Sequence, residues 1–502
     1  MDNMKSIVKT GIIGMLCIAA SCTGNFEEIN TPPTSFTKVD PGMLLATAQR
    51  NPKFNQGQEY QNSSYGSWVQ HWNSSNNIPM SLYIFARQGW DTYYSPIRNV
   101  AQIRNHLLKG QEDLPEARTK LAIARIVEAG IWQMLTDLFG DVPFSESALG
   151  EGNLNPQPKY DTQESIYAAL VQMVDGAVSQ INASDPSYGS SDLYYGGNAE
   201  KWVKYGNSLK LHLGMRMKYV NPTQAQKIVS EALNSSLISS NSDNALIKTG
   251  TTNSTSYHPV LTHMSSGSPS NRYLAEAFVN MLVNTKDPRL TYLVAPTANS
   301  VKAGGEPEYR GKVVAPTQDE MAGLIDDDYS QPSALFFMAS STTNPIPYYV
   351  LTYSEICFYK AEAALEGWAG LNDGQAEGFY REGIRAAMAL EPFRITEIPQ
   401  EYTDAECSFA GLSKEEKLEK IMNQKWILLF GRSIDAYGEW RRTGYPKLIP
   451  GHNLGATNGQ IPRRAGYPND EILLNPDNYN DAVSRMSQGD SYLSRVWWDV
   501  RN

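Results

Sequence analysis

The sequence predicts an all-α fold in which helices follow one another in pairs joined by short turns. One observation behind this prediction is that apolar residues recur every third or fourth position along most of the chain. Another is that these stretches begin at residues that cap helices and end at glycine or proline. A third is the contrast with residues 239–350, which are rich in Ser, Thr, Asn, Gly and Pro. We expect that region to form long irregular loops on the helical scaffold.

The helical signal is strongest in residues 413–446. Ser413 precedes an acidic turn, so it is predicted to cap the N-terminus of an amphipathic helix. Gly431 interrupts the apolar pattern and Gly444 ends it, which predicts two packed helices or one bent helix. The aromatic and cationic side chains of this region are predicted to form a buried structural brace, because no nucleophile accompanies them. They are Trp426, Trp440, Arg441 and Arg442.

The other predicted helices pair along the chain from Pro41, where order is expected to begin. They span residues 41–51, 92–110, 116–138, 164–181, 199–219, 223–237, 352–367 and 374–390. No clean 34-residue sequence period relates these pairs, so the sequence by itself does not establish a helical repeat.

The N-terminus, residues 1–21, has the order of an export signal. Lys5 and Lys9 supply positive charge, and a short apolar stretch then leads to small residues before Cys22. This order predicts a lipoprotein signal peptide, with Cys22 acylated as the first residue of the mature protein. Plain cleavage that leaves Cys22 free is the alternative. Residues 22–40 have no apolar period and are predicted to be a lipidated, flexible tether.

Only two further cysteines remain in the mature chain, Cys357 and Cys407. Two cysteines do not make a disulfide framework. Cys357 is predicted to be a small buried hydrophobic residue, and a bridge to Cys407 is the alternative.

Aromatic residues are abundant, with 28 Tyr, 14 Phe and 10 Trp, and some stand among amides rather than aliphatic residues. Ring faces stack on the C–H faces of sugars, and Asn and Gln side chains hydrogen-bond sugar hydroxyls. This pattern predicts a ligand-binding surface in two parts of the chain. Its expected residues are Trp68, Trp72, Asn76 and Tyr83 in the N-terminal part and Tyr309 and Tyr329 in the central loops.

The composition and the motifs argue against several other functions. A net charge of -10 disfavours nucleic-acid binding. None of the six histidines is followed by Glu, and no GxSxG sequence occurs, so the common zinc-hydrolase and serine-hydrolase motifs are absent. We therefore predict no catalytic residue, no metal ligand and no cofactor.

Several stretches together resemble the SusD/RagB family of outer-membrane nutrient-binding lipoproteins, particularly the branch described as starch-binding and outer-membrane-associating. They are residues 413–446, Leu351–Trp368, Ile461–Tyr479, Thr136–Phe144, Trp202–Arg216, Asp287–Leu290 and Arg495–Asp499. The resemblance implies a SusD-like fold with tetratricopeptide-like helix pairs, and a glycan-binding domain over residues 41–502.

The same resemblance implies a function and a location. The expected protein is lipid-anchored at the cell surface in the outer membrane, where it binds an oligosaccharide and delivers it to a SusC-like TonB-dependent transporter. The alternatives are a peptide-binding import lipoprotein of the RagB type and a secreted glycan hydrolase without a recognised motif.

Overall fold

The computed structural model describes residues 39–54, 65–74, 90–149, 155–250, 272–337 and 346–501. Residues from Pro41 onward form one compact unit. The predicted signal peptide, Cys22 and most of the predicted tether lie outside the described residues.

The longer helices of this unit are spread over its whole length. They are α3 (Pro41–Phe54), α5 (Trp90–Gln102), α6 (Pro115–Phe139), α7 (Gln163–Gln180), α8 (Ala199–Arg216), α9 (Pro222–Leu233), α11 (Glu276–Asn284), α16 (Tyr353–Glu366), α17 (Asp373–Met388), α19 (Lys414–Leu428), α20 (Ser433–Thr443) and α22 (Pro476–Ser484). The shorter ones are α12 (Leu290–Leu293), α13 (Ala298–Ala303), α14 (Gln318–Ala322), α15 (Ala334–Phe337), α18 (Gln400–Glu406) and α21 (Asn469–Leu474), and residues Ile103–Leu107 form a π-helical turn.

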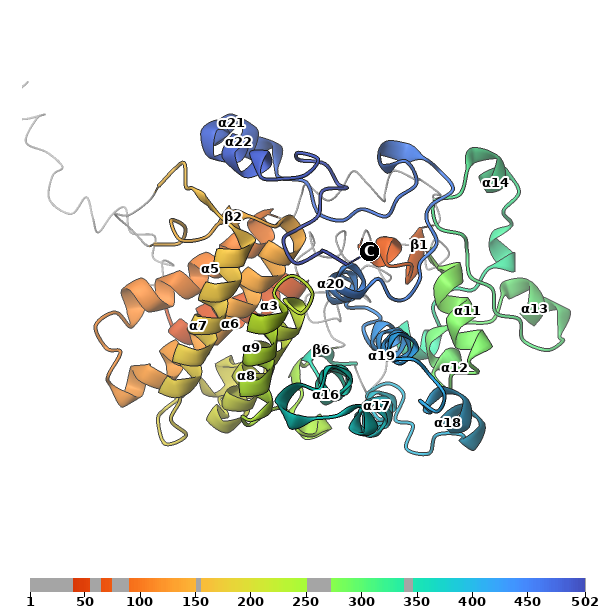
Figure 1. Cartoon of the computed structure of the whole chain (residues 1–502), viewed down its shortest axis with the longest axis horizontal. Coiled ribbons are helices and arrows are strands. Elements are labelled where there is room, and N and C mark those ends of the chain that lie inside the picture. Colours follow the sequence, from red (N-terminus) through yellow and green to blue (C-terminus); the bar gives the residue numbers. More distant parts are fainter. Residues whose placement is uncertain are drawn as a thin grey trace, which may run out of the picture. The chain divides into compact units, whose positions relative to one another are not determined.

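Consecutive helices pack in pairs, as predicted. α3 packs on α5, α6 on α7, α8 on α9, and α16 on α17, and α7 also contacts α8 (Figure 1). Figure 1 shows the first three of these pairs gathered on one side of the unit, with α16 next to α8 and α17 on the other side of α16. The predicted all-α fold built from helix pairs is therefore confirmed.

Local capping explains where the helices of the 413–446 region begin and end. The Glu416 amide donates to the Ser413 hydroxyl, and the Glu416 carboxylate accepts the Ser413 amide, which forms a capping box at the start of α19. Gly444 adopts a left-handed conformation with φ 76° and ends α20. The region forms two helices, one of the two predicted arrangements.

The region predicted to be irregular, residues 239–350, holds α11 and several helices of six residues or fewer. α11 was not predicted. Its apolar residues Phe278, Val279 and Leu282 are fully buried, so tertiary packing stabilises this helix. The polar residues on either side of it made the whole region look irregular in the sequence.

Three short antiparallel ribbons join distant parts of the chain. They pair β1 (Trp72–Ser74) with β5 (Arg272–Leu274), β2 (Val142–Pro143) with β3 (Tyr160–Asp161), and β4 (Ala245–Ile247) with β6 (Tyr348–Leu351). The β1–β5 ribbon links the N-terminal aromatic region to the central loops.

One helix crossing depends on a glycine. A Cβ atom at Gly438 would lie 2.7 Å from Nη2 of Arg216, so the absence of a side chain on α20 leaves room for the Arg216 guanidinium of α8. Cys357 and Cys407 are both free and buried, so the alternative of a bridge between them is not formed in this structure. Within the described ranges, no helix has the length and hydropathy needed to cross a bilayer.

Candidate functional site

The chain segments that carry Trp72, Tyr309 and Tyr329, three of the predicted ligand-binding residues, meet at the β1–β5 ribbon. Trp72 opens β1 and lies opposite Leu274 of β5. The amide of Lys312 donates to the Leu274 carbonyl at 2.8 Å, which places the segment of Tyr309 beside β5. The Leu274 amide in turn donates, at 3.1 Å, to the residue that follows Tyr329. Segments about 200 residues apart in sequence, those of Trp72 and of Leu274, therefore lie side by side.

Trp68 and Trp72 are placed in the core rather than on a surface. Trp68 is 1% exposed and its ring meets that of Tyr437 edge to face at 5.2 Å. Trp72 is 7% exposed and packs at 4.5 Å on Phe430. Neither ring offers a free face in this conformation, in contrast to the predicted surface position. Stacking of either ring on a sugar stays a prediction, and it requires that the ring leave this packing.

The other four predicted residues are Asn76, Tyr83, Tyr309 and Tyr329, and the structure describes only the last two. Asn76 and Tyr83 fall in residues 75–89, outside the described residues, so their roles stay predictions. Tyr309 is half-buried and borders the core. Tyr329 is 8% exposed. Of the predicted set within the described residues, Tyr309 offers the most accessible ring.

Two tyrosines and two cations form a compact group at this place, which we call the Tyr–Lys cluster: Tyr273, Tyr329, Arg310 and Lys312. Lys312 Nζ lies 4.5 Å from the ring centre of Tyr273 and 5.7 Å from that of Tyr329. The Arg310 guanidinium lies 5.0 Å from the Tyr329 ring centre. Each contact is a cation–π interaction, which fixes the direction of the cation.

Charge and burial define what the Tyr–Lys cluster can bind. Lys312 is fully buried, and its Nζ pairs at 2.9 Å with Asp326, whose side chain is 56% exposed. Burial and the charge of Asp326 raise the pKa of Tyr273 to about 12, so its hydroxyl stays protonated at neutral pH. Arg310 is exposed. Arg310 of the cluster thus supplies an accessible guanidinium donor, and Asp326 beside the cluster supplies a partly accessible carboxylate acceptor, both suited to hydroxyl groups.

Sequence reasoning named two tyrosines here but missed Tyr273, Arg310, Lys312 and Asp326. A usable signal exists in the sequence after Tyr309, because Arg310 and Lys312 are two residues apart and share a face when the chain is extended. Tyr273 gives no such signal, since its partners come from segments distant in the sequence.

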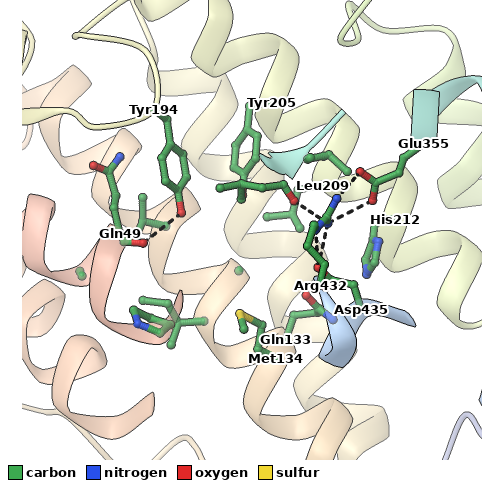
Figure 2. Close-up of a pocket in the computed structure, with 17 residues that line it drawn as sticks. Gln49, Gln133, Met134, Tyr194, Tyr205, Leu209, His212, Glu355, Arg432 and Asp435 are labelled. Carbon is green, nitrogen blue, oxygen red and sulfur yellow. Dashed lines mark hydrogen bonds and ion pairs between the residues drawn. The ribbon is translucent and has the colours of Figure 1, made fainter. Parts of the chain in front are cut away.

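An interior cavity of ≈ 50 Å³ lies between the N-terminal helices and α20. Figure 2 shows Arg432 between Glu355 and Asp435 on its wall. The guanidinium donates to Glu355 at 2.6 Å and pairs with Asp435 at 2.8 Å. Burial lowers the pKa of His212, which also lines the cavity, to about 3, so that imidazole is neutral. The cavity has room for water but not for a sugar, and its ion pairs hold elements together.

The predicted brace of α19 and α20 is buried and charged. Arg442 donates to both oxygens of Glu362 at 2.7 and 2.8 Å, and both residues are fully buried. Glu439 lies 3.1 Å from Arg216 and 3.1 Å from Lys425. Burial opposes the charge of Glu439, but Arg442, Lys425 and Arg216 together hold its pKa well below the usual value. This network stabilises the contact of α8, α16, α19 and α20, in accord with the predicted structural role.

Side chains able to bind a metal do not gather in the described part of the chain. No group of three or more His, Cys, Asp or Glu residues is close enough there to hold an ion. His258 and His263, two histidines five residues apart that could form a ligand pair in a loop, lie outside the described residues.

Helix pairs that carry a loop-built polar and aromatic cluster define a helical binding protein. The sequence profile of the family described as starch-binding and associating with the outer membrane matches residues 33–468. The chain therefore belongs to the SusD-like family. No curated protein matches the chain.

Solved structures of related proteins confirm the fold. A chitin-binding protein shares 30% identity with a TM-score of 0.79, and the alignment covers 92% of this chain and 100% of that one. A SusD homologue from Bacteroides uniformis shares 24% identity at a TM-score of 0.77, over 92% and 99% of the two chains. A chitin-binding SusD homologue from Flavobacterium johnsoniae shares 23% identity at 0.75, over 92% and 99%.

Proposed function

We propose that this protein is a cell-surface lipoprotein that binds an oligosaccharide and delivers it to a SusC-like TonB-dependent transporter in the outer membrane. The observation that carries the proposal is family membership over residues 33–468, together with a chitin-binding protein 30% identical over its whole length. The anchor of this proposed protein is the acylated Cys22, and residues 22–40 are its tether.

The ligand surface of this proposal is the region of the β1–β5 ribbon. Exposed Arg310 and Asp326 supply a donor and an acceptor for sugar hydroxyls, and half-buried Tyr309 supplies a ring edge or face. The other predicted residues complete the proposed set; they are Trp68, Trp72, Tyr329, Tyr83 and Asn76, which follows β1 by two residues. Each sugar–ring contact contributes on the order of 1 kcal/mol, so the isolated protein is expected to bind in roughly the micromolar to millimolar range.

Chitin and starch oligosaccharides are the first ligands to test, because the relative and the family description name these glycans. Calorimetric titration with chitohexaose and maltoheptaose should show binding of at least one. Arg310→Ala should then weaken that binding about tenfold. Arg385→Ala removes an arginine whose side chain is 64% exposed on α17 and serves as the matched control. No binding of any glycan in a broad panel would contradict the proposal.

A peptide ligand is the second candidate, and the charges of the Tyr–Lys cluster favour it. The exposed Arg310 and Asp326 would suit a chain that carries charges of both signs. Titration with a mixed tryptic peptide pool decides between a glycan ligand and a peptide ligand. If the protein binds peptides but no glycan, and Arg310→Ala abolishes peptide binding, the protein would be assigned to peptide import instead. Incubation of the protein with the same glycans should release no product. Release of a product would support the alternative of a secreted glycan hydrolase.

A further inference from the structure

A groove of ≈ 400 Å³ lies on the helical scaffold, at residues that the proposed ligand surface does not use. It opens where α8 and α16 end and where α9 and α19 begin. Figure 1 shows α16 between the α8–α9 pair and α19, and α16 contacts both α8 and α19. We call this feature the scaffold groove; its charged lining residues are Lys218, Glu366, Lys414, Glu415 and Arg501. A volume of this order is typical of a small-molecule site, whereas the interior cavity beside Arg432 has only ≈ 50 Å³.

Burial separates an apolar floor from a charged rim in the scaffold groove. Leu365, Trp368 and Leu418 line the groove and are between 4% and 7% exposed. The side chains of Lys414 and Glu415, in contrast, are 56% and 53% exposed. A ligand that enters the groove therefore meets ammonium and carboxylate groups first, and hydrocarbon and ring atoms below them.

Ion pairs hold the charged groups of the scaffold groove in place. Glu366 lies 2.7 Å from Lys218 and 2.6 Å from Lys414, and Arg501 pairs with Glu415. Burial would raise the pKa of Glu366, but attraction by Lys218 and Lys414 outweighs it and lowers the pKa, so this carboxylate is ionised at neutral pH. Because these contacts orient donors and acceptors in advance, binding of a ligand loses little conformational freedom.

The two exposed rim residues keep hydrogen-bonding capacity for a ligand. Lys414 Nζ belongs to an ammonium group with several N–H donors, and among the described residues it donates only to Glu366. Oε1 of Glu415 accepts from Tyr445 and Arg501, whereas Oε2 accepts no hydrogen bond from the part of the chain that the structure describes. The rim thus offers a donor and an acceptor on neighbouring residues. This combination matches a hydroxyl group, which both donates and accepts.

The charges at the scaffold groove are mixed in sign, which argues against an ionic ligand. Three cations and two carboxylates line the groove. Charged residues on the adjoining surfaces also include both signs; they are Lys417, Lys447, Arg495, Asp373, Glu416 and Glu419. An anionic ligand would approach Glu366 and Glu415, and a cationic ligand would approach the lysines, so neither gains a clear electrostatic advantage. A neutral ligand rich in hydroxyl groups fits this lining better.

We propose that the scaffold groove is a second binding site, for a neutral saccharide. The sugar hydroxyls bind the charged rim, and the C–H faces of the sugar contact the apolar floor. The choice of a saccharide among neutral, hydroxyl-rich ligands rests on the proposed function.

The scaffold groove is separate from the proposed ligand surface at the β1–β5 ribbon. Lys414 opens α19 at the groove, and Leu428 ends this helix two residues before Phe430, which packs on Trp72 of β1. A helix of 15 residues is about 22 Å long, so a single sugar unit cannot reach both places. One chain can therefore hold a saccharide at the groove while another occupies the ligand surface.

Fluorine NMR of the full chain labelled with 5-fluorotryptophan tests the proposal, because Trp368 lies in the floor of the groove. The Trp368 signal is assigned by its loss in Trp368→Phe. Titration with chitotriose and with maltotriose should shift this signal saturably for at least one of them. Lys414→Ala combined with Glu415→Ala should weaken the binding that Trp368 reports about tenfold or more, because each change removes a charge-assisted hydrogen bond. Both side chains are exposed, so the fold should be retained.

Lys286→Ala combined with Glu401→Ala is the matched control. These residues form another lysine–glutamate pair, with side chains 71% and 73% exposed, and neither lines the groove. The control should leave the Trp368 titration unchanged. Arg310→Ala, which acts at the Tyr–Lys cluster, should also leave it unchanged.

The scaffold groove and the proposed ligand surface can fail independently in these measurements. Calorimetric binding that Arg310→Ala weakens, without a shift of Trp368 by any neutral saccharide in a broad panel, would overturn the groove proposal and keep the ligand surface. A Trp368 shift that the Lys414 and Glu415 double variant loses, with total binding unaffected by Arg310→Ala, would keep the groove and remove the ligand surface.

Inorganic phosphate and glycylglycine test the rejected ionic ligands. A saturable shift of Trp368 by either of them, with no shift by neutral saccharides, would overturn the proposal. A saccharide-induced shift that the Lys414 and Glu415 double variant keeps at wild-type affinity would overturn it as well, because the rim would then not bind the sugar.

Discussion

Replacement of Arg442 by methionine should strongly destabilise the fold. The Arg442 guanidinium makes paired hydrogen bonds to Glu362 and a further one at 2.7 Å to Glu439, and no part of its side chain is exposed. Methionine fills much of the space but leaves Glu362 with Lys218 as its ion-pair partner among the described residues. Loss of one member of a buried ion pair costs about 3–5 kcal/mol of unfolding free energy.

The same variant should change how stability depends on pH. Burial would raise the pKa of Glu362, but attraction by Arg442 and Lys218 outweighs it and lowers the pKa to about 2, from an ordinary value of 4.5. The ionised Glu362 therefore stabilises the native state by roughly 3 kcal/mol above the unfolded pKa. This contribution is lost as pH falls from 4.5 toward 2. Without Arg442 the attraction is weaker and burial weighs more, so the loss below pH 4.5 should shrink.

Denaturant unfolding followed by tryptophan fluorescence at pH 7 and at pH 3.5 would measure both effects. Arg385→Met is the control, since Arg385 pairs with Glu382 on an exposed helix face and its replacement should change stability by less than about 1 kcal/mol. If Arg442→Met were as stable as the control at pH 7, or kept the wild-type pH dependence, the network would not stabilise the fold as argued.

Three other substitutions test the remaining assignments. Trp440→Ala should cost about 3–5 kcal/mol as a large buried ring is lost, and unchanged thermal stability with lost ligand binding would reverse its structural assignment. Trp68→Ala should cost about as much, and wild-type glycan affinity in the folded variant, measured by calorimetry, would remove Trp68 from the ligand-binding set. Cys22→Ala should release the protein from outer membranes into the soluble fraction, and its retention on membranes that lack the transporter would contradict the predicted anchor.

The long helices were predictable because their information is local. The apolar period of residues 116–138 and the glycine that follows predict a helix that the structure gives as Pro115–Phe139. Ser413 and the acidic turn that contains Glu416 likewise predict the start of α19. α11 escaped prediction because it has only nine residues and is supported mainly by burial.

The candidate site was predictable only in part because its geometry depends on distant partners. The polar neighbours of Trp68 and Trp72 suggested a surface, but Tyr437 and Phe430, from the far end of the chain, cover their rings. No local pattern reports such a partner. Tyr329 was predicted to contact a ligand. Its contact with Lys312 arises because the two segments lie along β5, and this alignment cannot be read from the sequence.

The ion-pair network has a consequence for the order in which the protein folds. Glu439 of α20 draws together Arg216 of α8 and Lys425 of α19, so α8 reaches its final charge environment only when α20 has arrived. A chain truncated before Ser433 would leave Arg216 with Asp137 as its ion-pair partner among the described residues. Lys425 of α19 has no ion-pair partner other than Glu439 among the described residues, so without α20 its buried ammonium would be left unpaired, which is unfavourable. A truncated chain of this kind should therefore be less stable than the full chain in its α8 and α19 contacts.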